Sequence, residues 1–310
     1  MSSVSVDTAP VAPETGASTR QPRRSKGGES GRAGWLVKLV VAVLCLLWLI
    51  PTFGLLVTSF RPGEAANSSG WWTVFASPFK ATQWTLENYN DVLFQGQTPM
   101  GISFINSFAV ALPATIIPIM IAAFAAYAFT FMDFWGRDAL FVLVVGLLVV
   151  PNYVAFVPLL QLYGKIGLNG TFPAVWLAHT GFGMPLAIYI LRNYMSSLPK
   201  AIIESAKIDG ASHFTTFWRL IVPMSVPALA SFAIFQFLWV WNDLLMALIF
   251  VSNPAKQPMT VKITQLLSTY AQEFHILAAA GFLLMAVPLI VFFALQRYFV
   301  RGLTAGSVKG

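Results

Sequence analysis

The chain has 310 residues, of which 57% are hydrophobic and only 10% are charged, with a formal net charge of +7. A soluble domain carries about 25% charged residues, so this composition nearly excludes a soluble globular enzyme, a disordered protein and a nucleic-acid-binding protein. The single cysteine, Cys45, excludes a disulfide framework and a cysteine-rich metal site. The long uncharged runs indicate an all-α integral membrane protein.

Six runs are long enough to cross a bilayer, whose apolar core of about 30 Å needs roughly 20 residues per helix. The predicted transmembrane helices cover residues 36–60, 102–131, 139–162, 172–192, 223–250 and 274–297. A glycine-rich turn at residues 164–170 separates the third helix from the fourth. None of the runs alternates apolar and polar residues as the strands of a membrane β-barrel do.

The distribution of Lys and Arg predicts the orientation. With six spans, both termini lie on one side, which then carries 14 of the 19 basic residues, whereas the other side carries five. Because basic residues gather on the cytoplasmic side, we expect both termini in the cytoplasm and a multi-pass protein of the cell membrane.

Residues 1–34 are rich in Ser, Gly, Pro and Arg and predict a disordered cytoplasmic tail. The apolar run after Trp35 is too long for the core of a signal peptide, so we expect an uncleaved first helix. The basic cluster Arg20–Lys26 is either an ordinary positive flank or a contact with anionic membrane lipid.

The loop between the first two helices, residues 61–100, is expected outside the cell. It contains Trp71, Trp72 and Trp84. Amphipathic aromatic side chains suit the membrane interface, and they equally suit a docking surface for an external partner. The sequence leaves both interpretations open.

The cytoplasmic segment between the fourth and fifth helices has its own local pattern. Pro199 suits the first turn of a helix, and Gly210 suits the left-handed position that follows a helix end. Ser212 suits the cap of a second helix, and Pro223 opens the fifth transmembrane helix. Four residues of the first short helix fall on helical spacing: Ala201, Ile202, Ser205 and Ala206. This helix–turn–helix is either a docking element or a simple interfacial connector.

The same segment resembles the EAA motif of permease subunits of binding-protein-dependent ABC importers. Glu204, Ala206, Gly210 and Pro223 match the motif at its spacing. The departures preserve the size class of the side chains: Ser205, Leu220 and Val222. The run Trp241–Leu245 and the ending Gly302–Gly310 resemble the carbohydrate branch of the family, similar to the second permease of maltose, trehalose and α-glucoside systems.

The resemblance implies a transmembrane permease domain at residues 35–310 and a coupling helix that docks on a cytoplasmic ATPase. The implied coupling residues are Glu204, Ser205, Ala206, Asp209, Gly210 and Ala211. The tail Arg301–Lys309 is expected to reach the same ATPase. The implied partners are a second permease in a heterodimer, two ATPase copies and an extracytoplasmic sugar-binding protein. The loop Ser252–Glu273 either meets that binding protein or is a simple interfacial helix.

One carboxylate, Asp243, lies inside a predicted helix, where a charge costs at least about 2.5–3.5 kcal/mol. Trp241, Asn242 and Asp243 are candidates for the lining of a sugar path, or for a hydrogen bond that fixes two helices together. Asn106, Asn152 and Gln236 are expected chiefly to bond neighbouring helices. His179 lacks a second ligand at metal-binding spacing, so the sequence predicts no metal site.

The chain contains no G-x-x-x-x-G-K-[ST] phosphate loop. We therefore expect ATP hydrolysis in a separate subunit, and neither a catalytic residue nor a cofactor in this chain. A secondary transporter and, less favoured, an integral membrane enzyme are the alternatives. The segment Trp71–Asp91 and the C-terminus look closest to permeases for α-glucosides, so an α-glucoside or another oligosaccharide is the expected substrate.

Overall fold

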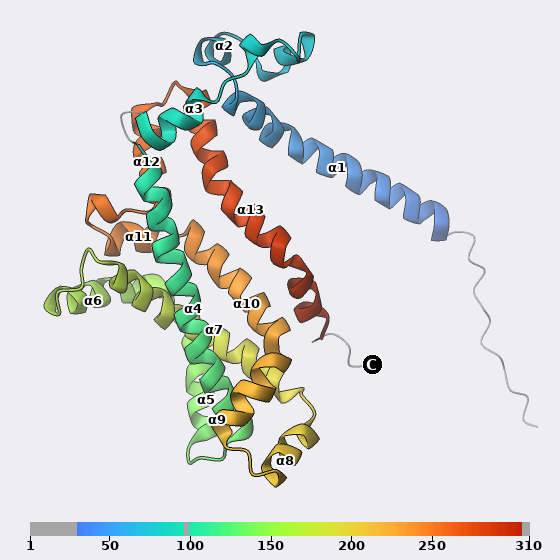
Figure 1. Ribbon diagram of the computed structural model, residues 1–310, viewed down its shortest axis with the longest axis vertical. Helices are drawn as coiled ribbons and strands as arrows, with labels where there is room; N and C mark the ends of the chain where they lie inside the picture. The colour runs from blue at the N-terminus through green and yellow to red at the C-terminus, as the bar shows by residue number, and fades with distance from the viewer. Residues whose placement is uncertain (1–29, 96–98, 306–310) are drawn as a thin grey trace, which may run out of the picture. The chain divides into compact units, whose positions relative to one another are not determined.

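The computed structural model describes residues 30–95 and 99–305, which form helices, short helical turns and loops but no strand (Figure 1). The predicted all-α fold is confirmed. The helices are α1 (Ser30–Ser59), α2 (Gly63–Ser68), α3 (Glu87–Asn90), α4 (Gly101–Phe131), α5 (Arg137–Gly146), α6 (Asn152–Lys165), α7 (Phe172–Ser196), α8 (Lys200–Ile208), α9 (His213–Thr216), α10 (Val222–Asn242), α11 (Leu245–Phe250), α12 (Met259–Thr269) and α13 (Phe274–Ala305).

Five of the described helices are long and apolar enough to cross a membrane, and a sixth crossing results if α5 and α6 count as one bent span. The five are Gly34–Ser59, Gly101–Phe131, Phe172–Ser196, His213–Asn242 and Phe274–Gln296. The expectation of six spans is therefore met only in this broader sense.

The chain divides into two units, Met1–Pro51 and Thr52–Gly310. The described part of the first unit is the apolar N-terminal portion of α1. Residues 1–29 of the expected disordered tail lie outside the described residues, and residues 30–34 belong to α1. The second unit holds the packed helices and both candidate sites.

Helix α4 is the central element of the second unit and packs most extensively on α7, then on α10. Its contact face carries small residues that are fully buried, and small residues let two helix backbones approach closely in a membrane. These residues are Ala111, Ala114, Ala122 and Ala126. Pro113 and Pro118 both remain inside α4.

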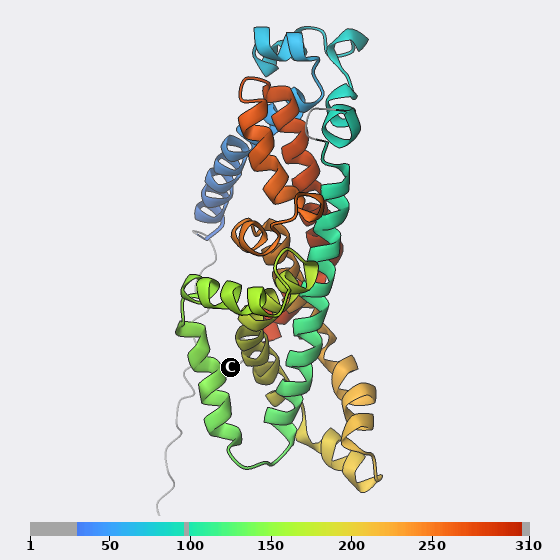
Figure 2. The same cartoon turned by 90° about the vertical axis from the view of Figure 1, so that its left-hand side faces the viewer.

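The third predicted span is wrong as a single helix. Helices α5 and α6 meet at an angle of 101°, and α6 runs across the direction of α4 in Figure 2. Pro151 explains the break, because proline disfavours a helical conformation in the preceding residue. Val150 accordingly has an extended conformation, with ψ of 121°.

The fifth predicted span, residues 223–250, is wrong at both ends. It begins at His213, because α9 runs through the π-helical stretch Phe217–Ile221 directly into α10. Pro223, which lacks the N–H that would bond the carbonyl four residues earlier, lies two residues after this stretch. At the other end, Asp243 turns extended with ψ of 118°, and a new short helix, α11, follows.

Loops from distant parts of the sequence share the two ends of the second unit (Figures 1 and 2). Helices α2, α3 and α12 lie at one end, and the α4–α5 turn lies with α8 and α9 at the other. The Asn106 amide donates to the Ala255 carbonyl at 2.9 Å, and the Ser107 hydroxyl accepts from the Met259 N–H at 2.8 Å. These bonds tie the segment at the start of α12 to α4.

Candidate functional site

Helix α8 packs against the rest of the second unit through one narrow face. Pro199 occupies its N-cap position, one residue before the predicted first turn. Ile203 and Ala206 are its buried residues, each 6% exposed, and they lie three apart on one side of a helix. The buried face is therefore centred on Ile203, which the sequence pattern did not single out, and Ser205 is exposed.

Gly210 ends α8 in the predicted left-handed conformation, with φ of 75°. Its N–H donates to the Lys207 carbonyl at 3.1 Å, and the Ala211 N–H donates to the Ala206 carbonyl at 2.9 Å. This pair of bonds is a Schellman motif, which satisfies the last carbonyls of a helix. An added Cβ at Gly210 would meet nothing within 4 Å, so no steric contact within this chain requires a glycine here. The requirement comes from the left-handed backbone conformation alone.

The second helix begins as predicted. The Ser212 hydroxyl accepts a hydrogen bond from the Thr215 N–H at 3.2 Å, which satisfies a free donor at the start of α9. Because α9 is continuous with α10 through the π-helical stretch, the turn at Gly210 connects a short surface helix directly to a membrane-spanning helix.

Aromatic contacts fix the start of this span to α4. The Tyr127 hydroxyl lies 2.9 Å from Nδ1 of His213, and the rings of Phe124 and Phe217 stack with centroids 4.4 Å apart. Tyr127 also meets Phe217 edge to face at 5.5 Å. The helix that follows the α8–α9 turn therefore contacts α4 and continues into α10.

The far side of α8 and its turn is exposed. Glu204, Asp209 and Gly210 are exposed, and Glu204 makes no ion pair or hydrogen bond within the described residues. Ile208 and Phe214 are 86% and 68% exposed beside them. We call Glu204, Ile208, Asp209, Gly210 and Phe214 the coupling surface.

Sequence reasoning missed Ile208 and Phe214 as members of this surface. The signal for Ile208 was present, because it lies four residues after Glu204 and such residues share a helix face. Two exposed apolar side chains thus lie in the same short stretch of sequence as the exposed Glu204 and Asp209.

The remaining predicted coupling residues line a groove of 420 Å³ between α8 and the start of the fifth span. Ser205, Ala206, Asp209 and Ala211 lie along it together with Arg219. Ala206 is almost wholly buried and supplies the acceptor of the Schellman motif, so its position in the fold is that of a packing residue.

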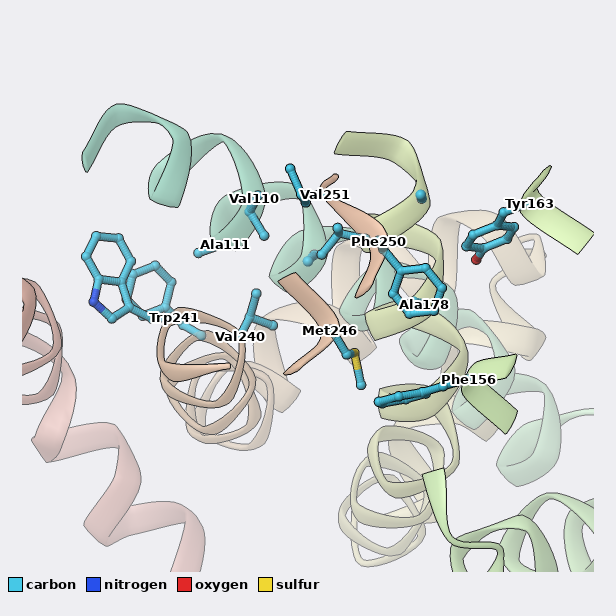
Figure 3. Close-up of a cluster of buried hydrophobic side chains, with 14 of the residues drawn as sticks. Val110, Ala111, Phe156, Tyr163, Ala178, Val240, Trp241, Met246, Phe250 and Val251 are labelled. Atoms are coloured by element: carbon cyan, nitrogen blue, oxygen red, sulfur yellow. The ribbon is translucent and has the colours of Figure 1, made fainter. Parts of the chain in front are cut away.

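Trp241 does not face an open path. Only 2% of it is exposed, and its indole N–H donates to the Leu284 carbonyl on α13 at 3.0 Å. Its ring packs on Phe108 and Phe237 at 4.9 and 5.5 Å. Figure 3 shows it beside Val110 and Ala111 of α4 in the buried cluster. Trp241 thus joins three helices of the core.

Asn242 and Asp243 do reach a cavity, of 310 Å³, which they share with Asn152, Tyr153 and Trp239. The Asp243 carboxylate also accepts the Met246 N–H at 2.8 Å and caps α11. The sequence left open either a cavity lining or a hydrogen bond that fixes two helices together. The observed bond caps α11, and Asp243 makes it while it also lines the cavity.

Two other polar side chains bond neighbouring segments as expected. Asn106 holds the loop before α12, and the Gln236 amide donates to the Ala114 carbonyl at 3.1 Å. His179 is 1% exposed, and its ring lies 5.1 Å from that of Trp239. Among the described residues, no group of three His, Cys, Asp or Glu side chains gathers at metal-binding distance.

Comparison with known proteins gives a consistent set of relatives. Residues 118–305 match the family described as binding-protein-dependent transport system inner membrane component. The chain is 53% identical to the osmoprotective compounds uptake permease protein GgtD of Synechocystis sp., over 88% of this chain and 91% of that protein. It is 42% identical to the alpha-glucoside transport system permease protein AglG of Rhizobium meliloti, over 89% and 97% of the two chains.

A solved structure shares the fold. It is a chain of a bacterial ABC transporter involved in the import of the acidic polysaccharide alginate, with a TM-score of 0.69 and 17% identity. The match covers 89% of this chain and 99% of that one.

Proposed function

This chain belongs to the family of binding-protein-dependent transport system inner membrane components, and from this membership we propose that it forms half of the translocation pathway of an ATP-driven sugar importer. The other half is a second permease in a heterodimer. The protein is a multi-pass membrane protein, and we assign it to the cell membrane with both termini in the cytoplasm.

The observation that carries the proposal is the coupling surface at the end of the fifth span. ATP hydrolysis takes place in two copies of a separate cytoplasmic subunit. That subunit can shift the permease between inward- and outward-facing states only if it binds them differently. A rigid turn joined to α10 and held on α4 by Tyr127 and His213 suits this task.

Glu204 is the charged member that we assign to a basic group on the ATPase, and Gly210 provides the turn between the two helices. The tail Arg301–Lys309 is proposed to reach the same subunit; part of it lies outside the described residues. A secondary transporter and a membrane enzyme are not favoured, because the family match covers residues 118–305 and the relatives are importer permeases.

At the opposite end, we propose that the segment Ser252–Glu273 meets an extracytoplasmic sugar-binding protein. Helix α12 lies within this segment, and Asn106 and Ser107 hold the segment on α4. The names of GgtD and AglG support an osmoprotective compound or an α-glucoside as the solute.

A charge reversal at Glu204 tests the coupling assignment. The side chain is exposed and has no partner in the described residues, so Glu204→Lys is expected to leave the fold intact. We expect uptake in membrane vesicles to fall about tenfold or more, within the usual range of coupling between sites, while ATP hydrolysis no longer depends on solute.

The matched control is Glu64→Lys, an equally exposed glutamate at the other end of the second unit. It is expected to retain uptake. Normal, solute-dependent transport in Glu204→Lys would overturn the docking assignment.

A further inference from the structure

Both breaks in the membrane-spanning helices border one cavity. Helix α6 restarts at Asn152 after the bend at Pro151, and α10 ends at Asn242 just before Asp243. The 310 Å³ cavity is lined from both sides by these residues. Its volume reaches the lower end of the range for small-molecule sites, about 300–1,000 Å³.

The lining combines polar side chains with apolar ones, although the surrounding helices are apolar. Asn242 is exposed, and Asn152 and Asp243 are half-buried, with Tyr153 and Trp239 beside them. Irregular backbone and ionisable side chains at membrane depth are tolerated where they line a hydrated cavity or are buried in protein. The exposed amide and the partly exposed carboxylate favour the hydrated alternative.

An adjoining hollow of 210 Å³ shares Asn152 and Trp239 with this cavity. Gln236 lines it and is 1% exposed, and its Oε1 has no hydrogen-bond partner within the described part of the chain. Such a buried acceptor calls for a donor. The two hollows together therefore offer acceptors to hydroxyl groups and aromatic rings, among them Tyr153 and Trp239, to a sugar face.

The charge of the cavity has one sign. Asp243 is the charged residue among those that line it, and no lining residue is Lys or Arg. The segment after α11 carries Lys256, which lies over the Phe172 ring at 5.9 Å, and α12 carries Lys262, which donates to the Gln265 side chain at 3.1 Å. Neither lysine is among the residues that line the cavity, so neither neutralises the charge of Asp243 there.

We propose that this cavity is a charge-selective segment of the solute path, which admits neutral or cationic polyhydroxylated solutes and disfavours carboxylate-bearing ones. The proposal rests on the proposed function, because it assumes that solute passes through this chain. It adds a selection step in the permease itself, carried by Asp243. A fixed carboxylate in a confined space repels a solute that carries a like charge and attracts one of opposite charge.

Charge-selective thiol labelling tests the proposal in the assembled transporter. The background is Cys45→Ser, which removes the only native thiol of this chain, and the reporter is Asn242→Cys, whose labelling is read on this chain after the subunits are separated. The probes are methanethiosulfonates with an ethylammonium or an ethylsulfonate group, each rate being divided by the rate for 2-mercaptoethanol. We expect the cationic probe to react about tenfold faster or more after this correction.

Asp243→Asn is the informative variant, because its side-chain oxygen can still accept the Met246 N–H. It is expected to bring the corrected ratio close to one, whereas Glu64→Gln, a charge removal at an exposed residue of α2, leaves it unchanged. A ratio near one with Asp243 present, or a thiol that neither probe reaches, would overturn the charge-selective cavity. Sugar uptake by the unmodified transporter is measured in parallel; its absence would instead refute the proposed function and leave the labelling result standing.

Discussion

Gly210→Pro is expected to reduce solute uptake to about a hundredth of the wild-type rate or less, because a misplaced proline costs about 3 kcal/mol and each 1.4 kcal/mol is tenfold. Gly210 has a φ of 75°, whereas proline is restricted to about −65°. Proline also removes the N–H that donates to the Lys207 carbonyl. The turn between α8 and α9 must then change, and with it the coupling surface.

Gly210→Ala gives the graded version of the same experiment. Its Cβ would meet no atom within 4 Å, so only the left-handed conformation opposes it, at about 1–2 kcal/mol. That strain corresponds to a factor of about 5–30 in an equilibrium between two conformations. Uptake and ATP hydrolysis in membrane vesicles, with the membrane level of each variant as reference, measure the effect.

Gly136→Ala is a matched control for the strain itself. Gly136 has a φ of 79°, meets no atom within 4 Å of an added Cβ, and lies in the α4–α5 turn at the same end. It is expected to leave coupling between hydrolysis and uptake unchanged. If both alanine variants uncoupled ATP hydrolysis from uptake to the same extent, the Gly210 turn would have no specific role in that coupling.

Trp241→Ala is expected to destabilise the folded protein severely. Replacing a fully buried tryptophan by alanine costs about 3–5 kcal/mol in a packed interior, and here it also leaves the Leu284 carbonyl without its donor. The contact with Phe108 that joins α10 to α4 would be lost, together with the stacking on Phe237 within α10. The measurement is the midpoint of thermal unfolding in detergent, with the yield of monodisperse protein.

Two further variants separate packing from solute contact. Trp241→Phe retains most of the ring packing and is expected to remain folded and active, and Trp135→Ala removes a tryptophan that is 100% exposed and should change stability little. If Trp241→Ala unfolded at the wild-type temperature but transported nothing, Trp241 would be a solute contact and its assignment to the core would be wrong.

Local motifs predicted the coupling segment well. The left-handed Gly210 and the Ser212 cap depend on backbone geometry within a few residues, and both appear in the structure. What sequence could not supply was the neighbouring element: Ile203 is the buried centre of α8 because of what it packs against. The hydrogen bond between Tyr127 and His213 joins residues 86 positions apart, and no local pattern indicates it.

The hydrophobic pattern could not predict where the membrane-spanning helices break. An uncharged run reports only that its residues can lie in lipid, so 139–162 looked like one span. Pro151 ends a helix, whereas Pro113 and Pro118 stay inside α4. The difference lies in packing, because neighbouring helices can satisfy the backbone groups that an interior proline frees.

The choice between Trp239 and Trp241 shows the same limit. Two residues that are two apart on a helix point to nearly opposite sides, so one of them must face the core when the other lines the cavity. Helix α10 is apolar on almost every side, so its sequence does not indicate which side faces the core. The structure buries Trp241 against α13 and places Trp239 at the cavity.

The central claim is that this chain works only as the permease partner of other subunits. Purification of the tagged full chain from its native membrane in mild detergent, with mass spectrometry of the intact complex, tests it most directly. We expect one copy of this chain, one copy of a different multi-span permease and two copies of an ATPase. Isolation of this chain alone, or only with copies of itself, from complexes shown to remain intact would contradict the account.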